Sequence, residues 1–189
     1  MNIKRWIQAE YLPILLIALM VLTRFHHFGD FLHLPDASLA VFFFAGFYRK
    51  KAFLGFLLGL AALIDYVSIE NGTSGWCVTP AYAFLIPTYA TMWIAGRYSA
   101  MFKTLHLVEL VKAFGLLMLS ASFAFVISNA SFYLFSGKFG SLAVFDYLTS
   151  VSQYYVPFVG STLVYGILGF GAVKLLKTIT ALISQHKAI

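Results

Sequence analysis

A loop around the single cysteine of the chain carries the residues best suited to chemistry. The stretch Asn71–Tyr82 reads NGTSGWCVTPAY and joins two apolar segments. Thr79 followed by Pro80 is typical of a helix start, with the threonine hydroxyl as N-cap and the proline at the first helical position. Cys77 would then precede the positive end of a helix dipole, which favours the thiolate. The spacing therefore predicts a reactive thiol in this loop.

One thiol is compatible with only a few kinds of site. A buried, unreactive cysteine is the simplest interpretation, and a structural zinc site is disfavoured because zinc takes four ligands. A metal already held in a macrocycle, as in haem or cobalamin, needs only an axial ligand from the protein. A catalytic Cys–His pair would need a positioned histidine, and His26, His27 and His33 lie in another predicted outer loop. The residues alone leave these alternatives open.

A carboxylate lies in an apolar segment near the same predicted membrane surface. Asp65 follows Leu63 and Ile64, and a carboxylate in a bilayer normally faces a cavity, a partner or a substrate path. A structural pair with a polar group on a neighbouring helix is the alternative. Aromatic residues at this level form either an interfacial belt or the wall of a site for a large, flat ligand. We expect them to meet Cys77 and Asp65 at one outward-facing mouth. They are Tyr66, Trp76, Tyr82, Tyr154 and Tyr155.

The elements that must position these residues are membrane-spanning helices. Of the 189 residues, 61% are hydrophobic and 11% are charged, whereas a soluble domain has about 25% charged residues. One crossing takes about 20 residues, so six crossings leave no room for a soluble domain. The composition predicts an all-α integral membrane protein with one domain over residues 1–189, and excludes a soluble globule or a disordered chain. The expected helices are 10–24, 37–48, 52–70, 79–98, 105–135 and 155–183.

Two features of these segments bear on packing. Residues 37–48 are too few to cross a hydrocarbon core of about 30 Å. The segment must extend through Pro35 and Asp36, be re-entrant, or lie where the bilayer is thin. Small residues predict close helix contacts, or a face that docks a partner. These are Gly55 and Gly59 in the third segment, and Gly166, Gly169 and Gly171 in the last.

The charge distribution predicts the orientation of the helices. The chain has 13 Lys and Arg against 7 Asp and Glu, which gives a formal net charge of +6. In a membrane protein such an excess marks cytoplasmic loops, so no nucleic-acid partner is expected. With six spans and both termini in the cytoplasm, only Arg24 and Lys138 lie outside. The basic residues inside are Lys4, Arg5, Arg49, Lys50, Lys51, Arg97, Lys103, Lys112, Lys174, Lys177 and Lys187.

Two stretches resemble a known family. Residues 34–48, reading LPDASLAVFF and then AGFY after Phe44, look like the early part of BtuM-type cobalamin transporters. Residues 76–82, reading WCVTPAY, are similar to the cysteine loop of that family. These bacterial proteins are related to the substrate-binding S-components of energy-coupling-factor (ECF) transporters. Size, expected helix count and topology agree over essentially the whole chain.

The resemblance implies an S-component-like bundle of six transmembrane helices, multi-pass in the bacterial cytoplasmic (inner) membrane, that binds cobalamin at its outer face. It implies that Cys77 ligates cobalt and is linked to removal of cyanide from cyanocobalamin, with Asp65 and Tyr82 near that centre. Cys77 and Asp65 are therefore the candidate catalytic residues, and Cys77 is the candidate metal ligand. The candidate contacts to cobalamin are Trp76, Thr79, Tyr82, Tyr66 and Tyr155.

Three hypotheses of function follow. The first is cobalamin uptake with slow or stoichiometric decyanation, the second is decyanation with turnover, and the third is a haem-binding or scaffold subunit without transport. No G-x-x-x-x-G-K motif occurs, so no nucleotide site is expected and energy must come from a partner or from intracellular trapping. Many S-components dock their coupling subunit through A-x-x-x-A on the first helix. Here Ile14 and Leu22 occupy the positions four residues before and after Ala18, so the A-x-x-x-A motif is absent. Whether an ECF ATPase and coupling module is a partner is therefore left open.

Overall fold

The fold is described from a computed structural model, which describes residues 3–25, 34–48, 51–102 and 107–186. Within these residues all regular structure is helical, as the composition predicts. Two short 3-10 helices, η1 and η2, precede α5. The elements are α1 (Ile3–Arg24), α3 (Ser38–Tyr48), α4 (Lys51–Glu70), η1 (Gly75–Cys77), η2 (Pro80–Phe84), α5 (Leu85–Ser99), α6 (Leu107–Phe135), α7 (Val144–Ser152) and α8 (Tyr155–His186).

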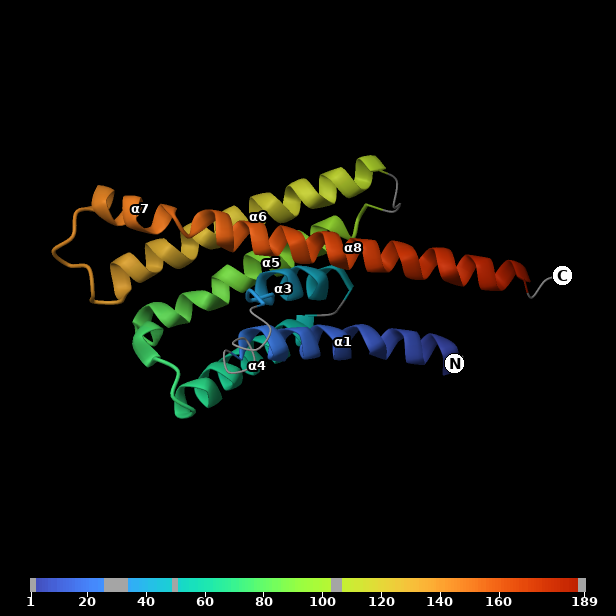
Figure 1. Cartoon of the computed structure of the whole chain (residues 1–189), viewed down its shortest axis with the longest axis horizontal. Helices are drawn as coiled ribbons and strands as arrows, with labels where there is room; N and C mark the ends of the chain where they lie inside the picture. The colour runs from blue at the N-terminus through green and yellow to red at the C-terminus, as the bar shows by residue number, and fades with distance from the viewer. Residues whose placement is uncertain (1–2, 26–33, 49–50, 103–106, 187–189) are drawn as a thin grey trace.

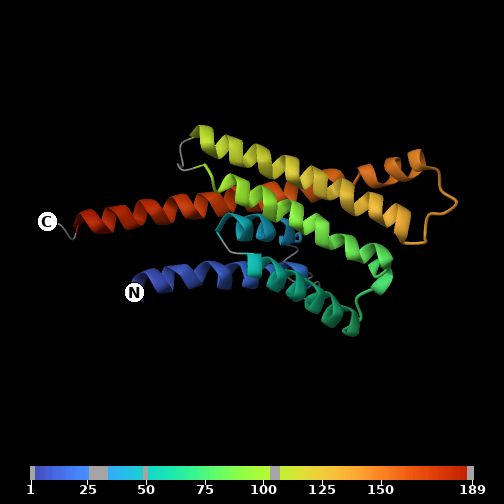
Figure 2. The ribbon, with the colours of Figure 1, turned by 180° about the vertical axis from the view of Figure 1, so that it is seen from behind.

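The helices other than α7 run alternately in opposite directions along an elongated bundle (Figure 1). Helices α1 and α4 form one side, α6 and α8 form the other, and α3 and α5 lie between them, as the view from behind also shows (Figure 2). The start of α1 and the end of α8 lie at the same end of the bundle, here called the terminal end. Residues 71–84 and α7 lie at the opposite end, here called the loop end.

Three helices in the described part of the chain are long and apolar enough to cross a membrane by length and composition. They are Lys51–Glu70, Leu107–Phe135 and Tyr155–Ala172, and the shorter apolar helices are Leu12–Arg24 and Ser38–Phe47. Large apolar side chains on their outer faces are exposed, among them Leu63, Phe123 and Leu168. Such faces suit lipid rather than water, so the chain has the character of a membrane protein. The expected number of six spans and the orientation of the termini stay predictions.

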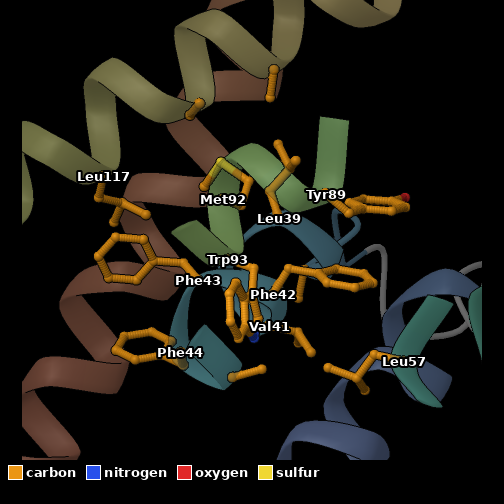
Figure 3. Packing of buried hydrophobic residues seen from close by; sticks show 14 of the residues in the cluster. Leu39, Val41, Phe42, Phe43, Phe44, Leu57, Tyr89, Met92, Trp93 and Leu117 are labelled. Atoms are coloured by element: carbon orange, nitrogen blue, oxygen red, sulfur yellow. The ribbon is translucent and has the colours of Figure 1, made fainter. Parts of the chain in front are cut away.

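The short second segment forms the centre of the bundle. In α3 the residues from Ser38 to Gly46 are all buried, and Figure 3 shows its aromatic side chains packed among residues of α4, α5 and α6. Phe42 stacks on Tyr89 with ring centroids 4.2 Å apart, and Phe44 contacts Phe170 edge-on at 5.2 Å. Of the three alternatives for this segment, extension of the helix through Pro35 and Asp36 is wrong, because residues 34–37 are not helical. Neighbouring helices enclose α3, so it can be short.

Glycines allow the closest contact in the bundle, between α3 and α5. A Cβ on Gly46 would lie 2.0 Å from the carbonyl oxygen of Trp93, and a Cβ on Gly96 would lie 1.9 Å from that of Phe43. Neither position tolerates a side chain without moving backbone. These two glycines were not singled out by the sequence pattern.

The outcome for the predicted glycine contacts is mixed. A Cβ on Gly166 or Gly169 would collide with Leu117 or Phe44 side chains, so these contacts are confirmed. A Cβ on Gly55, Gly59 or Gly171 would meet nothing within 4 Å. The prediction of close packing within the chain is therefore wrong for these three. The four-residue spacing fixes one helix face, but it does not reveal whether that face points inward.

Three boundaries also differ from the expected ones. The helical region expected over 79–98 starts as η2 at Pro80 and becomes α-helical only at Leu85. The first helix begins at Ile3 rather than near residue 10, and α8 continues to His186. Helix α7 was not expected, because its nine residues are too few for a crossing and mix polar with apolar side chains. Its buried residue Tyr147 donates a hydrogen bond to the backbone oxygen of Asn129 on α6.

Candidate functional site

A buried ion pair joins α1 to α4 near the loop end. The Arg24 Nε and Nη2 atoms donate to Asp65 Oδ1 and Oδ2 at 2.7 and 2.6 Å. This two-point geometry matches the planar guanidinium to the carboxylate. The side chains are 10% and 23% exposed, respectively. The alternative interpretation of Asp65, a structural pair with a polar group on a neighbouring helix, is therefore present.

Arg24 also connects α1 to the start of α3 and to α5. Its Nη1 atom donates to Asp36 Oδ2 at 3.3 Å, to Ser38 Oγ at 3.1 Å and to the hydroxyl of Tyr89. Asp36 Oδ1 in turn accepts from the backbone N–H of Ser38 at 2.9 Å, which satisfies a donor in the first turn of α3. One cation at the end of α1 thus holds together segments that are far apart in the sequence.

Tyr82 joins the cysteine loop to this network. Its hydroxyl donates to Asp65 Oδ2 at 2.6 Å. Burial, together with this hydrogen bond to Asp65, raises the pKa of Tyr82, which lies in η2 ahead of α5. The phenol therefore stays protonated and acts as a donor at neutral pH. Asp65 accepts hydrogen bonds at both carboxylate oxygens, so its main role in this structure is to orient Arg24 and Tyr82.

A pocket of about 230 Å³ opens beside the network. Ser68 lies in its wall and is 3% exposed, and its hydroxyl has no hydrogen-bond partner within the described residues. A buried hydroxyl without a partner is costly, and this oxygen is itself buried within the wall. Helix α4, the cysteine loop and the Arg24 network all contribute to the wall. The lining residues are Arg24, Asp36, Asp65, Ser68, Ile69, Thr73, Ser74, Val78 and Tyr82.

Cys77 lies in the loop that forms one wall of this pocket. Its backbone belongs to the short turn η1, in which the N–H of Val78 donates to the oxygen of Gly75 at 2.9 Å. Ser74 and Val78, on either side of the cysteine in the sequence, both line the pocket. The side chain of Cys77 falls outside what the structure describes, so its role as ligand stays a prediction.

The predicted helix start at Thr79 is correct in position, but the predicted capping hydrogen bond of its hydroxyl is absent. Pro80 occupies the first helical position, and Thr79 precedes it with extended backbone. The Thr79 hydroxyl makes no capping hydrogen bond and is buried without a described partner. The helix opens as a five-residue 3-10 turn rather than an α-helix.

The structure places the other candidate residues away from the pocket. Trp76 packs against Phe132 and Phe139, and Lys138 lies over its ring at 3.9 Å. Tyr66 is 62% exposed. Tyr155 lies between α6 and α8, with its hydroxyl 2.8 Å from that of Ser122. The structure brings together Asp65 and Tyr82 of the predicted cluster, whereas Trp76, Tyr66, Tyr154 and Tyr155 do not line the pocket.

The residues that sequence reasoning missed are Arg24, Asp36, Ser38 and Tyr89. Arg24 was noted only as one of two basic residues expected outside. A cation there against the overall bias, close in the sequence to Asp30 and Asp36, is the signal that would have found it.

The histidines considered for a catalytic Cys–His pair, His26, His27 and His33, lie outside the described residues. Among the residues that were described, no group of three His, Cys, Asp or Glu side chains is placed to hold a metal ion. Compared with known proteins, the chain matches no protein-family model and no curated protein.

Proposed function

We propose that this protein binds cobalamin at the loop end and takes it up across the bacterial cytoplasmic membrane, with the Cys77 thiolate as axial ligand of cobalt. The observation that supports this best is the position of the cysteine loop. Ser74 and Val78 flank Cys77 and line the pocket that also contains Asp65 and Tyr82. A lone cysteine in a loop that lines a pocket with charged and hydroxyl side chains suits a metal that arrives already held in a macrocycle.

In this proposal the pocket holds one edge of the ligand rather than the whole. Its volume of about 230 Å³ is below the roughly 300–1,000 Å³ of typical small-molecule sites, and a corrinoid is larger than most ligands. We expect the ring to lie across the mouth with a polar substituent in the pocket. The Arg24–Asp65 pair fixes the charged side of the wall.

The chemistry we propose at Cys77 is a ligand exchange. The thiolate donates an electron pair to cobalt and forms the Co–S bond, while the Co–C bond to cyanide breaks and cyanide leaves with its electron pair. No electron is transferred between metal and protein in this step. Because each Cys77 forms one such bond, we expect at most about one cyanide per protein unless cobalamin is released.

We also propose six crossings with both termini in the cytoplasm, which places the loop end outside. The alternating direction of the helices (Figure 1) and the cations predicted inside support this arrangement. The energy for uptake would come from a separate ATPase partner or from trapping of cobalamin inside the cell. Growth of a cobalamin auxotroph carrying only this transporter, with and without an ECF ATPase and coupling module, distinguishes the two.

The experiment that tests binding uses purified protein in detergent. We expect the wild type to bind cyanocobalamin and to change its visible spectrum as cyanide leaves. Cys77→Ser should abolish the spectral change and should retain part of the binding, because the polar contacts remain. Thr149→Ala is the control, because Thr149 is exposed on α7 at the loop end and does not line the pocket, and it should behave as wild type. A wild-type spectrum in Cys77→Ser would reject the axial thiolate, and absence of binding by the wild type would reject the function. Binding of haem instead would favour the haem-binding alternative.

A further inference from the structure

An apolar groove runs between α6 and α8 near the terminal end. Its volume is about 390 Å³. Leu110 and Phe114 line it on α6, and Ile167 and Phe170 line it on α8. This groove is separate from the pocket beside Cys77, which lies at the loop end. Nothing in the function proposed above uses it.

The floor of the groove is open because a glycine lies there. Gly171 is exposed, and a Cβ added to it would meet nothing within 4 Å. A side chain at this position would instead project into the groove. In a bilayer, an apolar channel of this kind on the outer face of two helices is filled by hydrocarbon.

The charge at the end of the groove favours one kind of lipid. Lys174 is exposed, and it is the one charged residue among the described residues that line the groove. The nearby acid on α6, Glu109, is already paired with Lys112 at 3.1 Å. Within the described residues Lys174 forms no ion pair, so it can attract an anion. Basic pockets between membrane helices are typical sites for anionic headgroups.

We propose that the α6–α8 groove binds an anionic phospholipid, with an acyl chain against Phe114 and Phe170 and the phosphate at Lys174. The lipid would then contact α6 and α8, the two longest helices described in the bundle. The proposal does not depend on cobalamin, so the two can fail separately. A helix of a partner protein is the competing occupant of the same groove.

Native mass spectrometry of the protein in mild detergent tests the proposal, with phosphatidylglycerol and phosphatidylcholine of identical acyl chains as probes. Lys174→Ala should reduce retention of phosphatidylglycerol about fivefold, the effect of one cation near a lipid phosphate, and should leave phosphatidylcholine unchanged. Lys51→Ala is the matched control. It removes an exposed cation from the start of α4, outside the groove, and should retain both lipids as the wild type does.

A second pair of variants tests the groove itself. Gly171→Leu fills the floor and should reduce retention of both lipids. Gly115→Leu adds the same side chain at an exposed position on α6 that does not line the groove and has nothing within 4 Å, and it should change neither. Equal retention by all four variants would overturn the proposal, as would a preference for phosphatidylglycerol that survives Lys174→Ala. Loss of a defined membrane-protein partner in Gly171→Leu, with lipid retention unchanged, would assign the groove to a partner helix.

Discussion

Replacing Arg24 with methionine removes the cation that joins α1, α3, α4 and α5. The variant keeps the apolar stem of the side chain but leaves the carboxylate of Asp65 without its two charged donors at 2.7 and 2.6 Å. Breaking a buried ion pair by removing one partner costs about 3–5 kcal/mol. Asp65 keeps 23% exposure and the hydrogen bond from Tyr82. We therefore expect a loss near the lower limit, about 3 kcal/mol in the free energy of unfolding.

The assay is reversible unfolding in mixed detergent micelles, followed by far-UV circular dichroism. Lys112→Met is the matched control, because Lys112 and Glu109 form an ion pair with 55% and 25% exposed side chains. Losing that pair should cost about 0.5 kcal/mol or less. The double variant Arg24→Met/Asp65→Asn should lose at least about 1 kcal/mol less than the two single variants added together. Equal stabilities of Arg24→Met and Lys112→Met, or strict additivity in the double variant, would refute the reasoning.

Three further predictions use the same unfolding assay. Gly46→Ala should cost about 3 kcal/mol, because the new Cβ would lie 2.0 Å from a backbone oxygen of α5, whereas Gly55→Ala, with open space around it, should be neutral or stabilising by up to about 1 kcal/mol. Equal effects of the two would contradict the packing described for α3 and α5. Tyr82→Phe should cost about 1.5–3 kcal/mol, since it removes a hydrogen bond to the carboxylate of Asp65, and no loss would mean that this bond is not formed. Thr79→Val should cost less than about 1 kcal/mol because the hydroxyl has no described partner, and a larger loss would reveal one.

The sequence predicted the long helices well because long apolar runs have few alternatives to a helix. Residues 52–70 and 105–135 were expected to be helical, and α4 and α6 occupy Lys51–Glu70 and Leu107–Phe135. Helix α7 was missed because its pattern is short and mixed. The role of α3 was also missed, since its length argues against a crossing until the enclosing helices are known.

The candidate site could be predicted only in part. A carboxylate at Asp65 and a donor at Tyr82 followed from residue type and predicted depth, and the structure joins them at 2.6 Å. The partner that dominates the site, Arg24, lies 41 residues from Asp65 in the sequence, and no local pattern connects two residues so far apart. Tyr66 and Tyr155 do not line this pocket, because depth in the membrane does not determine which side of a helix a residue occupies, and their contacts to a ligand stay predictions.

The Co–S bond itself is the most direct test of the central proposal. Cobalt K-edge X-ray absorption of the purified protein with bound cobalamin should show one sulfur neighbour of the metal. Cys77→Ser should lose this sulfur while cobalt keeps its light-atom ligands. Identical spectra of the two proteins, without sulfur in either, would contradict the assignment of Cys77 as the axial ligand.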